Sequence, residues 1–342
     1  MQFDPAGAAS RGAAAGARPR GYADAPSPPV ADDVATRSFA AADHGTTPLT
    51  AVGHHPARAA VAMLVAVAVF ALMDAGLKQL SMQYPPFQVA ALRGAASLPF
   101  VLAWVLATTG LRPLLRARWS LHLLRGGLAV LMMSTFVYAI RTLPLTTAYS
   151  LFFIAPLLVT ALSVPILRER VGPRRWTAIA VGLFGVLVLL RPTGEGLASL
   201  ASVAVLVAAL AYAISAITVR VLARTDSTQS MMVWLLVMLA LGAGALALPG
   251  WVPMRAVDGW LILGVGLAGA VGQYAITEAF RMGEASQIAP LEYTALVWGV
   301  LLDLTLWGVL PDAVTWLGAA IIVTSGLYLL RRERVHAEAE HP

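Results

Sequence analysis

The chain has 342 residues, of which 58% are hydrophobic and only 12% are charged. A soluble globular domain carries about twice that charged fraction, so the composition favours a protein whose natural solvent is the lipid bilayer. The net charge of +6 does not indicate nucleic-acid binding, because the arginines cluster at the ends of apolar blocks, where membrane topology explains them. The absence of cysteine excludes disulfides, thiol catalysis and cysteine metal sites.

Residues 1–56 differ in composition from the rest of the chain. They are rich in Ala, Gly, Pro and small polar residues and contain no apolar run, which predicts a disordered N-terminal tail. An over-called start codon is the alternative. The segment is not a secretory signal, because no apolar core follows its early arginines.

Ten apolar segments follow, and a spanning helix needs roughly 20 mostly apolar residues. Because the connections are short, we predict an all-α polytopic membrane protein with ten transmembrane helices and no separate soluble domain. The segments are Ala59–Leu80, Phe87–Thr108, Leu121–Ile140, Leu145–Leu167, Trp176–Leu190, Ala198–Leu222, Ser230–Pro249, Trp260–Phe280, Ala285–Val309 and Val314–Leu330.

Basic residues in the connections predict the orientation. With a cytoplasmic N-terminus, twelve arginines fall on the inner side and only Arg141, Arg191 and Arg255 on the outer side. Cytoplasmic loops carry an excess of basic residues, so both termini are predicted to lie in the cytoplasm, with residues 333–342 as a C-terminal tail.

The sequence also repeats internally. At an offset of 140 residues Arg141 matches Arg281 and Trp176 matches Trp316, and at an offset of 142 residues 70–78 resemble residues 212–220. Each unit holds five helices, an odd number, so two units joined in one chain must have opposite topologies. Inverted repeats around a midplane site are a recurring plan of secondary transporters. The predicted repeats span residues 57–192 and 197–332.

These features resemble the drug/metabolite transporter superfamily, and specifically its EamA type. The similar stretch is Leu167-Arg168-Glu169-Arg170 followed by Trp176 and the glycines Gly182 and Gly185. The second repeat departs from this pattern, with Val309 in place of the glutamate. The resemblance implies two inverted five-helix repeats in the inner membrane that move small metabolites without ATP.

A finer resemblance concerns the substrate. Residues 70–74 and 289–293, with Pro311-Asp312, resemble the branch that contains S-adenosylmethionine uptake proteins, and riboflavin uptake proteins share much of the first pattern. S-adenosylmethionine, an amino acid derivative and riboflavin therefore all stay open as substrates, and H+ and Na+ stay open as coupling ions.

Ionisable residues at bilayer depth are candidate functional residues, because burying them is expensive. Asp74 and Lys78 share one face of the first helix, so Asp74 either binds a cation or proton in the cavity or pairs with Lys78. Lys78 and its counterpart Arg220 are expected to be interfacial anchors. Arg93 is expected to pair with Asp74, contact a substrate carboxylate or reach the outer surface. Arg125 is expected to be a cytoplasmic anchor.

Glu292 is the sharpest candidate for substrate binding or coupling. It lies about eight residues into the ninth segment, roughly 12 Å deep, and follows Pro290. A proline leaves a carbonyl without its usual donor, which is tolerated where a helix lines a cavity. The alternative is a buried carboxylate bonded to a neighbouring Tyr or Arg. Glu278 is expected to pair with Arg281.

Aromatic side chains offer stacking surfaces for a ring-bearing substrate, although most such residues pack or anchor helices. The candidates are Tyr138, Tyr149, Tyr212, Tyr274, Tyr293 and Trp298. The glycines Gly182, Gly185, Gly269 and Gly272 are expected to permit close helix contacts.

Two other classes compete with a transporter: a polytopic membrane enzyme and a non-transporting scaffold. The six histidines lie in tails or at a helix end, and no HExxH or phosphate-binding loop is present, so we predict that the chain is not an enzyme and has no cofactor or metal. The predicted partners are the lipid bilayer and a small-molecule metabolite, with no nucleic acid. A homodimer stays open.

Overall fold

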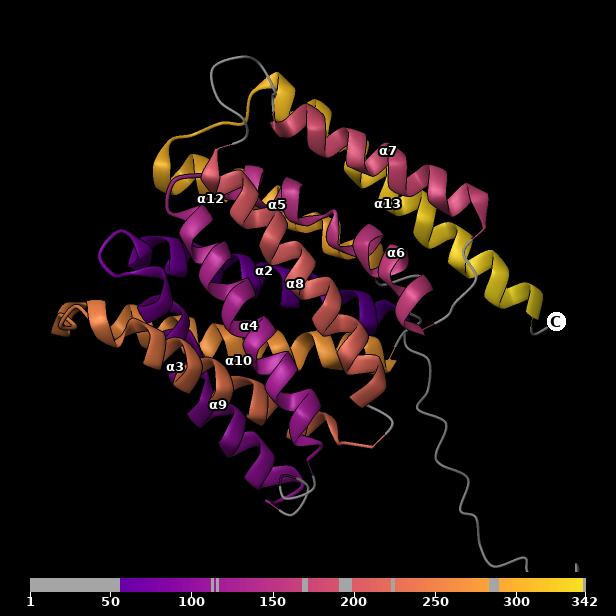
Figure 1. The fold of residues 1–342 in the computed structure, drawn as a ribbon. Coiled ribbons are helices and arrows are strands. Elements are labelled where there is room, and N and C mark those ends of the chain that lie inside the picture. The colour runs from indigo at the N-terminus through magenta and orange to yellow at the C-terminus, as the bar shows by residue number, and fades with distance from the viewer. Residues whose placement is uncertain are drawn as a thin grey trace, which may run out of the picture. The chain divides into compact units, whose positions relative to one another are not determined.

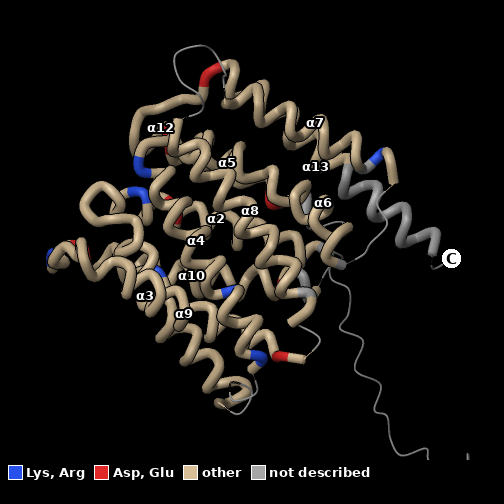
Figure 2. The backbone as a smooth tube through the Cα atoms, viewed as in Figure 1, with Lys and Arg blue, Asp and Glu red and all other residues tan. Residues whose placement is uncertain are grey.

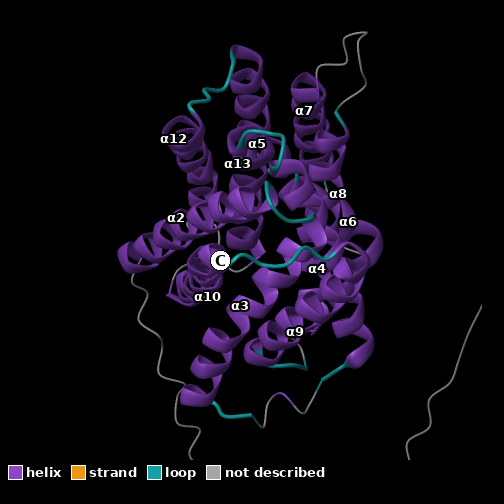
Figure 3. Ribbon diagram, turned by 90° about the vertical axis from the view of Figure 1, so that its left-hand side faces the viewer, coloured by secondary structure: helices purple, strands orange, loops and turns teal. Residues whose placement is uncertain are grey.

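A computed structural model of the protein describes residues 56–111, 114, 117–167, 172–190, 199–222, 225–282 and 289–340. The predicted disordered tail lies outside these residues. Every element within them is a helix (Figures 1 and 3). The α-helices are α2 (Pro56–Ser81), α3 (Pro86–Thr108), α4 (Trp119–Ile140), α5 (Leu145–Phe152), α6 (Ala155–Leu167), α7 (Pro173–Leu190), α8 (Leu200–Leu222), α9 (Thr228–Ala247), α10 (Gly259–Met282), α12 (Ala295–Trp307) and α13 (Ala313–Glu340). Three 3-10 helices are η2 (Leu248–Gly250), η3 (Ala256–Asp258) and η4 (Ala289–Thr294).

Seven helices in this part of the chain are long and apolar enough to cross a membrane, and the stretches Trp176–Leu190 and Ala313–Tyr328 are shorter apolar helices. Together they confirm the predicted all-α polytopic membrane fold. Figure 2 shows that the tube is mostly free of charged residues, which gather mainly toward the ends of the helices. Each of the ten predicted segments contains a helix, although the count of ten membrane crossings stays a prediction.

Two of the predicted segments are not continuous α-helices. The fourth divides into α5 and α6, because Pro156 has no N–H to donate to the carbonyl of Phe152. The ninth was expected to run unbroken over 285–309, which is wrong. Its described part begins as the 3-10 helix η4, which contains Pro290, and α12 ends before Gly308, whose φ is +66°. Glu292 therefore lies in η4, and the depth expected from α-helical rise does not apply to it.

The two breaks are at equivalent places in the repeats. At the offset of 140 found in the sequence, Phe153 and Ile154 between α5 and α6 correspond to Tyr293 and Thr294 at the end of η4. The interrupted helix is thus a feature of both repeats. Discontinuous helices near midplane sites are common in transporters built from inverted repeats.

The packing of helices follows the same symmetry. Helix α2 packs against α10, and its counterpart α8 packs against α4, the counterpart of α10. Helices α3 and α9 correspond to each other and pack together, as do α7 and α13, which lie side by side in Figure 1. All four large helix pairs join one repeat to the other. The interior of the bundle is therefore built between the repeats and not within each of them.

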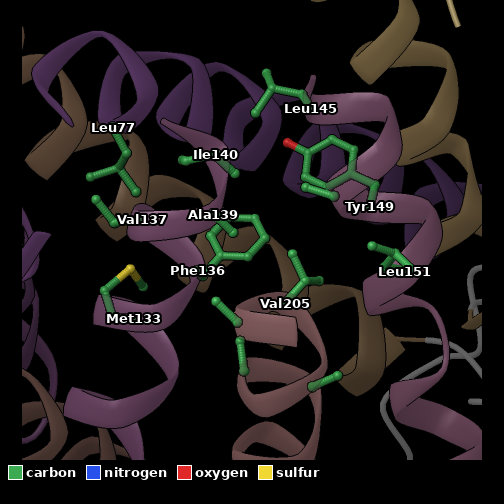
Figure 4. Close-up of a cluster of buried hydrophobic side chains, with 14 of the residues drawn as sticks. Leu77, Met133, Phe136, Val137, Ala139, Ile140, Leu145, Tyr149, Leu151 and Val205 are labelled. Carbon is green, nitrogen blue, oxygen red and sulfur yellow. The ribbon is translucent and has the colours of Figure 1, made fainter. Parts of the chain in front are cut away.

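The largest buried apolar cluster lies where these pairs meet. Figure 4 shows Leu77 of α2, Val137 and Ile140 of α4, Leu151 of α5 and Val205 of α8 in this cluster. Leu77, Ile140 and Val205 are fully buried. Without a hydrophobic driving force between helices in lipid, such contacts stabilise the bundle by close packing.

Glycines allow several of these helices to approach closely, as predicted. A Cβ at Gly185 would lie 2.8 Å from Ile322 on α13, and one at Gly272 would lie 2.9 Å from the ring of Phe70 on α2. Gly182 faces Ser325 and Gly269 faces Ser97 at similar distances. The expected packing role of these four glycines is therefore confirmed.

We predict that Gly94→Ala destabilises the protein. A Cβ there would lie 2.8 Å from the backbone nitrogen of Ala240 and 3.1 Å from the carbonyl oxygen of Leu236, and backbone atoms cannot move aside. Overpacking of this kind costs about 1–3 kcal/mol. Thermal unfolding of the purified protein should give a lower Tm. Gly127→Ala is the matched control, because nothing lies within 4 Å of a Cβ at that position. Equal Tm values for the two variants would contradict the prediction.

Candidate functional site

The first group of polar residues surrounds Asp74 on α2. The hydroxyl of Tyr149 on α5 donates a hydrogen bond of 3.0 Å to Asp74 Oδ2. Arg93 on α3 lies close enough for its positive charge to attract the same carboxylate. The pairing of Arg93 with Asp74 stays a prediction, and Tyr149 is a partner of Asp74 that charge patterning alone does not reveal.

Lys78 interacts with the second repeat, and the alternative that it pairs with Asp74 is wrong. Its Nζ lies 3.8 Å from Asp303 Oδ1 on α12 and 4.5 Å from the centre of the Trp307 ring, and it donates a 2.7 Å hydrogen bond to the carbonyl of Leu143. Lys78 is buried, so it is not the expected interfacial anchor. The side chain of its counterpart Arg220 lies outside the described residues. The α4–α5 connection and α12 together supply the partners that hold the ammonium group inside.

Asp303 is a key residue that the sequence reasoning did not select. Its carboxylate accepts the N–H groups of Leu145 and Thr146 at 2.9 and 2.8 Å and the hydroxyl of Thr146 at 2.9 Å. Helix α5 begins after Pro144, which has no side-chain acceptor for these orphan donors. A helix start without a capping residue, combined with an aspartate in an apolar helix, is the signal that could have found this interaction.

A second group surrounds Glu292 in η4. The carboxyl group lies within electrostatic range of the hydroxyls of Tyr212 on α8 and Tyr293. Among the described residues neither Glu292 nor the buried hydroxyl of Tyr293 has a hydrogen-bond partner. Tyr212 is 41% exposed. This group therefore combines a carboxyl group and two phenols whose hydrogen-bonding capacity is not used within the described structure.

Aromatic rings connect this group to α5. Phe152 lies 5.5 Å from Tyr212 and 5.8 Å from Phe136, and Phe153 lies 4.8 Å from Tyr293, between ring centroids. Phe153 and Tyr293 are equivalent positions of the two repeats, so this contact lies at the symmetry axis that relates them. Because Tyr149 and Phe152 are one turn apart on α5, this short helix touches both the Asp74 group and the Glu292 group.

The remaining candidates lie elsewhere. Tyr138 is 40% exposed, and Tyr274 is also exposed, with its ring edge toward Trp104. Trp298 packs against the apolar cluster of Met63 and Val67 on α2. No hydrogen bond or ring contact joins Tyr138, Tyr274 or Trp298 to the Asp74 or Glu292 groups within the described structure. The expected pairing of Glu278 with Arg281 involves a side chain, that of Arg281, outside the described residues.

Polar contacts also join the repeats at each end of the bundle. Where α2 ends, Tyr84 donates to Asp258 at 2.6 Å and Gln88 forms two hydrogen bonds with the backbone of Val252. Where α4 begins, Asp226 interacts with the ring of His122 at 2.9 Å and accepts the N–H of Arg118 at 3.1 Å. The contact of Asp226 with His122 lies at the start of α4, and Asp303 binds the chain just after α4 ends. The 22 residues of α4 therefore separate the two carboxylates by about 33 Å.

The carboxylate of Asp226 is tuned by these contacts. Burial acts to raise its pKa, but hydrogen bonds from Thr225, His122 and the backbone of Arg118 outweigh burial and hold the pKa below its ordinary value. The ionised form is therefore the one that the folded protein stabilises.

Together the apolar helices, the symmetric packing and the paired charges between two repeats define a multi-pass membrane protein of the transporter class. The family model of the EamA-like transporter family matches residues 57–191 and again residues 199–331. The chain therefore belongs to the EamA-like transporter family, within the drug/metabolite transporters, and is a transporter of small metabolites.

Several characterised relatives carry names that state a substrate. The riboflavin transporter of Vibrio cholerae is 32% identical over 294 residues, which cover 84% of this chain and 98% of the relative. The riboflavin transporter of Rhizobium johnstonii is 32% identical over 62% of this chain and 70% of its own length. The S-adenosylmethionine uptake transporter of Rickettsia prowazekii is 26% identical over 81% and 94%, respectively.

A solved crystal structure supports the fold. The match covers 80% of this chain and 98% of the chain in that crystal structure, with a TM-score of 0.56 and a sequence identity of 22%. At this level of identity the likeness shows the arrangement of helices alone.

We predict that Asp226→Asn lowers stability at neutral pH and flattens its dependence on acid pH. A depressed folded-state pKa gives stability that is present above the unfolded pKa and is lost as pH falls through the folded pKa. The asparagine variant lacks this pH-dependent stability, and its amide is a weaker acceptor for the buried donors. We expect a loss of about 1–3 kcal/mol at pH 7, which corresponds to a fall in Tm of about 3–8 °C. Thermal unfolding between pH 3 and 7, a range set by the ordinary aspartate pKa of about 3.9, measures both effects. An unchanged acid slope in the variant would contradict the role of Asp226.

Proposed function

We propose that the protein carries riboflavin, or a close flavin, across the membrane, and that the ring system binds beside α5 between the two repeats. The riboflavin transporter of Vibrio cholerae is 32% identical to this chain over 98% of its own length. This likeness is the observation that carries the proposal.

The chemistry around α5 supports a flat, largely uncharged substrate. Phe152 with Tyr212, and Phe153 with Tyr293, offer ring faces and edges on both sides of the helix break. Lys78 and Asp303 neutralise each other, and Asp74 is held by Tyr149 and attracted by Arg93. The carboxyl group of Glu292 is available to accept hydrogen bonds from the hydroxyl groups and the imide N–H of a flavin. Aromatic pairs contribute about 0.5–1.5 kcal/mol beyond the area that they bury.

S-adenosylmethionine is the second candidate, because Glu292 has no cationic partner among the described residues and would attract a positively charged substrate. The two candidates differ in their response to Glu292→Gln. The change keeps the shape of the side chain and removes its charge. For a cationic substrate, binding should weaken tenfold to a hundredfold, about 1.5–3 kcal/mol. For a neutral flavin, which needs only an acceptor, the effect should be smaller.

We predict that Tyr212→Ala weakens riboflavin exchange about fivefold to tenfold in half-saturation, because one stacking surface is lost. The measurement is counterflow of labelled riboflavin in proteoliposomes, with S-adenosylmethionine tested in parallel. Tyr138→Ala is the matched control, since Tyr138 is equally exposed but lies outside the aromatic set. Equal effects of the two substitutions, or no riboflavin counterflow at all, would argue against the proposed site.

The same assay addresses coupling and catalysis. We propose that the chain has no enzymatic activity, so substrate recovered after exchange should be chemically unchanged. Either H+ or Na+ serves as the coupling ion in this proposal. If Glu292 carries a coupled proton, Glu292→Gln abolishes gradient-driven accumulation but spares exchange at equal pH.

The Asp74 group and the Glu292 group are each formed by residues of one chain, so the proposed site does not require a homodimer.

The proposed setting is the inner membrane, with repeats at 57–192 and 197–332 and with both tails, 1–56 and 333–342, in the cytoplasm. The excess of basic residues on one side supports this orientation. We predict that a C-terminal alkaline phosphatase fusion is inactive and a C-terminal fluorescent fusion is bright. Deletion of residues 1–53 should leave insertion and transport intact. An active phosphatase fusion would overturn the orientation.

A further inference from the structure

A small cavity lies among α3, α4, α9 and α10. Its volume is about 40 Å³, and its polar lining consists of Arg93 and Ser97 from α3, Arg125 from α4 and Gln273 from α10. Apolar residues of α9 close one side. Helix α3 packs against α4, α9 and α10, and α4 also packs against α9. Figure 1 shows α3, α9 and α10 in the lower part of the view with α4 crossing beside them. The cavity is therefore formed by both repeats.

Three hydrogen-bond donors at this cavity have no partner. The Nε atoms of Arg93 and Arg125 and the hydroxyl of Ser97 are all buried, and none of them forms a hydrogen bond with the described residues. Buried donors without an acceptor cost free energy, so three of them around one cavity indicate a missing acceptor. Gly269 contributes space, because a Cβ there would lie 2.7 Å from the hydroxyl oxygen of Ser97.

The charge of the lining is positive and is not balanced locally. No Asp or Glu lines the cavity. Arg93 is attracted by Asp74, but Arg125 interacts with the backbone instead, by donating a 2.7 Å hydrogen bond from Nη1 to the carbonyl of Met231. A guanidinium inside a membrane protein is normally paired or hydrated, because an isolated charge at this depth is expensive. The expected role of Arg125 as a surface anchor does not account for its buried Nε.

We propose that this cavity is a binding site for one small inorganic anion, of which chloride is the physiological representative. The anion is held by the guanidinium groups of Arg93 and Arg125 and by the hydroxyl of Ser97, and it neutralises the charge of Arg125. The cavity has room for a small monatomic anion such as chloride. Because α3 and α4 belong to one repeat and α9 and α10 to the other, the bound anion joins the two repeats.

The first test is thermal unfolding of the purified full chain without substrate, in sodium gluconate or sodium chloride at one ionic strength. A ligand that binds only the folded state raises Tm in a saturable way. We expect chloride to raise Tm by about 3 °C or more. Arg125→Gln should remove the chloride response, whereas Arg141→Gln, which changes an exposed arginine, should retain it. Equal Tm values in the two salts, or an equal chloride response in Arg125→Gln, would overturn the proposal.

Two further measurements test the anion site even if Arg125→Gln fails to fold. Ser97→Ala removes one donor with little change in volume and should raise the chloride concentration for half-maximal stabilisation severalfold. Crystals of the wild type soaked in bromide should show an anomalous peak between Arg93 and Arg125. A cavity that contains water only, or an unchanged half-maximal concentration in Ser97→Ala, would also contradict the site. None of these readouts depends on riboflavin being the substrate.

Discussion

The carboxylate of Asp303 satisfies a constraint on which much of the arrangement between the repeats depends. A helix that begins inside an apolar bundle exposes N–H groups that neither water nor lipid can satisfy. Helix α5 begins in this way after Pro144, and Asp303 accepts two of its backbone donors and the hydroxyl of Thr146. Lys78 then balances the charge of the carboxylate. One aspartate from α12 thereby fixes α5, whose next turns carry Tyr149 and Phe152 toward the two proposed functional groups.

The polar contacts divide the bundle into regions with different properties. Near Asp303 and near Asp226, at opposite ends of α4, buried carboxylates receive several donors each and join one repeat to the other. Elsewhere, in the Tyr293 hydroxyl beside Glu292 and in the side chains of Arg93, Ser97 and Arg125, buried polar atoms keep unused hydrogen-bonding capacity within the described structure. A transporter needs contacts that hold its repeats together and polar groups that can bind a ligand. The buried carboxylates supply the contacts, and the unsatisfied groups are available for binding.

The sequence predicted the parts of the structure that depend on length and period. Apolar runs located the long helices of the described residues, because a bilayer imposes a minimum length on each span. The inversion of the repeats, which follows from an odd number of segments in each, stays a prediction. The partners of buried charged residues were harder to predict from the sequence, because they depend on which helix faces pack together. The spacing of Asp74 and Lys78 suggested a pair, but Tyr149 and Asp303 are their partners. The interruption in the ninth segment was missed because Pro290 was read as a local defect of one helix rather than as the start of a 3-10 helix. Arg93, Asp74 and Glu292 were selected as candidates because a charge within an apolar segment is expensive, and their roles stay predictions.

The contact between Phe153 and Tyr293 bears on how such a chain can arise and diverge. In a dimer of two identical five-helix chains with opposite orientations, this position would meet its own copy, and the two rings could not differ. Fusion into one gene releases that restriction, so that one copy can acquire a hydroxyl while the other does not. The same reasoning applies to Asp303, whose counterpart is Ser163, and to Glu292, whose counterpart is Phe152. A duplicated and fused gene can therefore place a single acidic group on one side of the axis, which makes the two halves of the bundle chemically unequal.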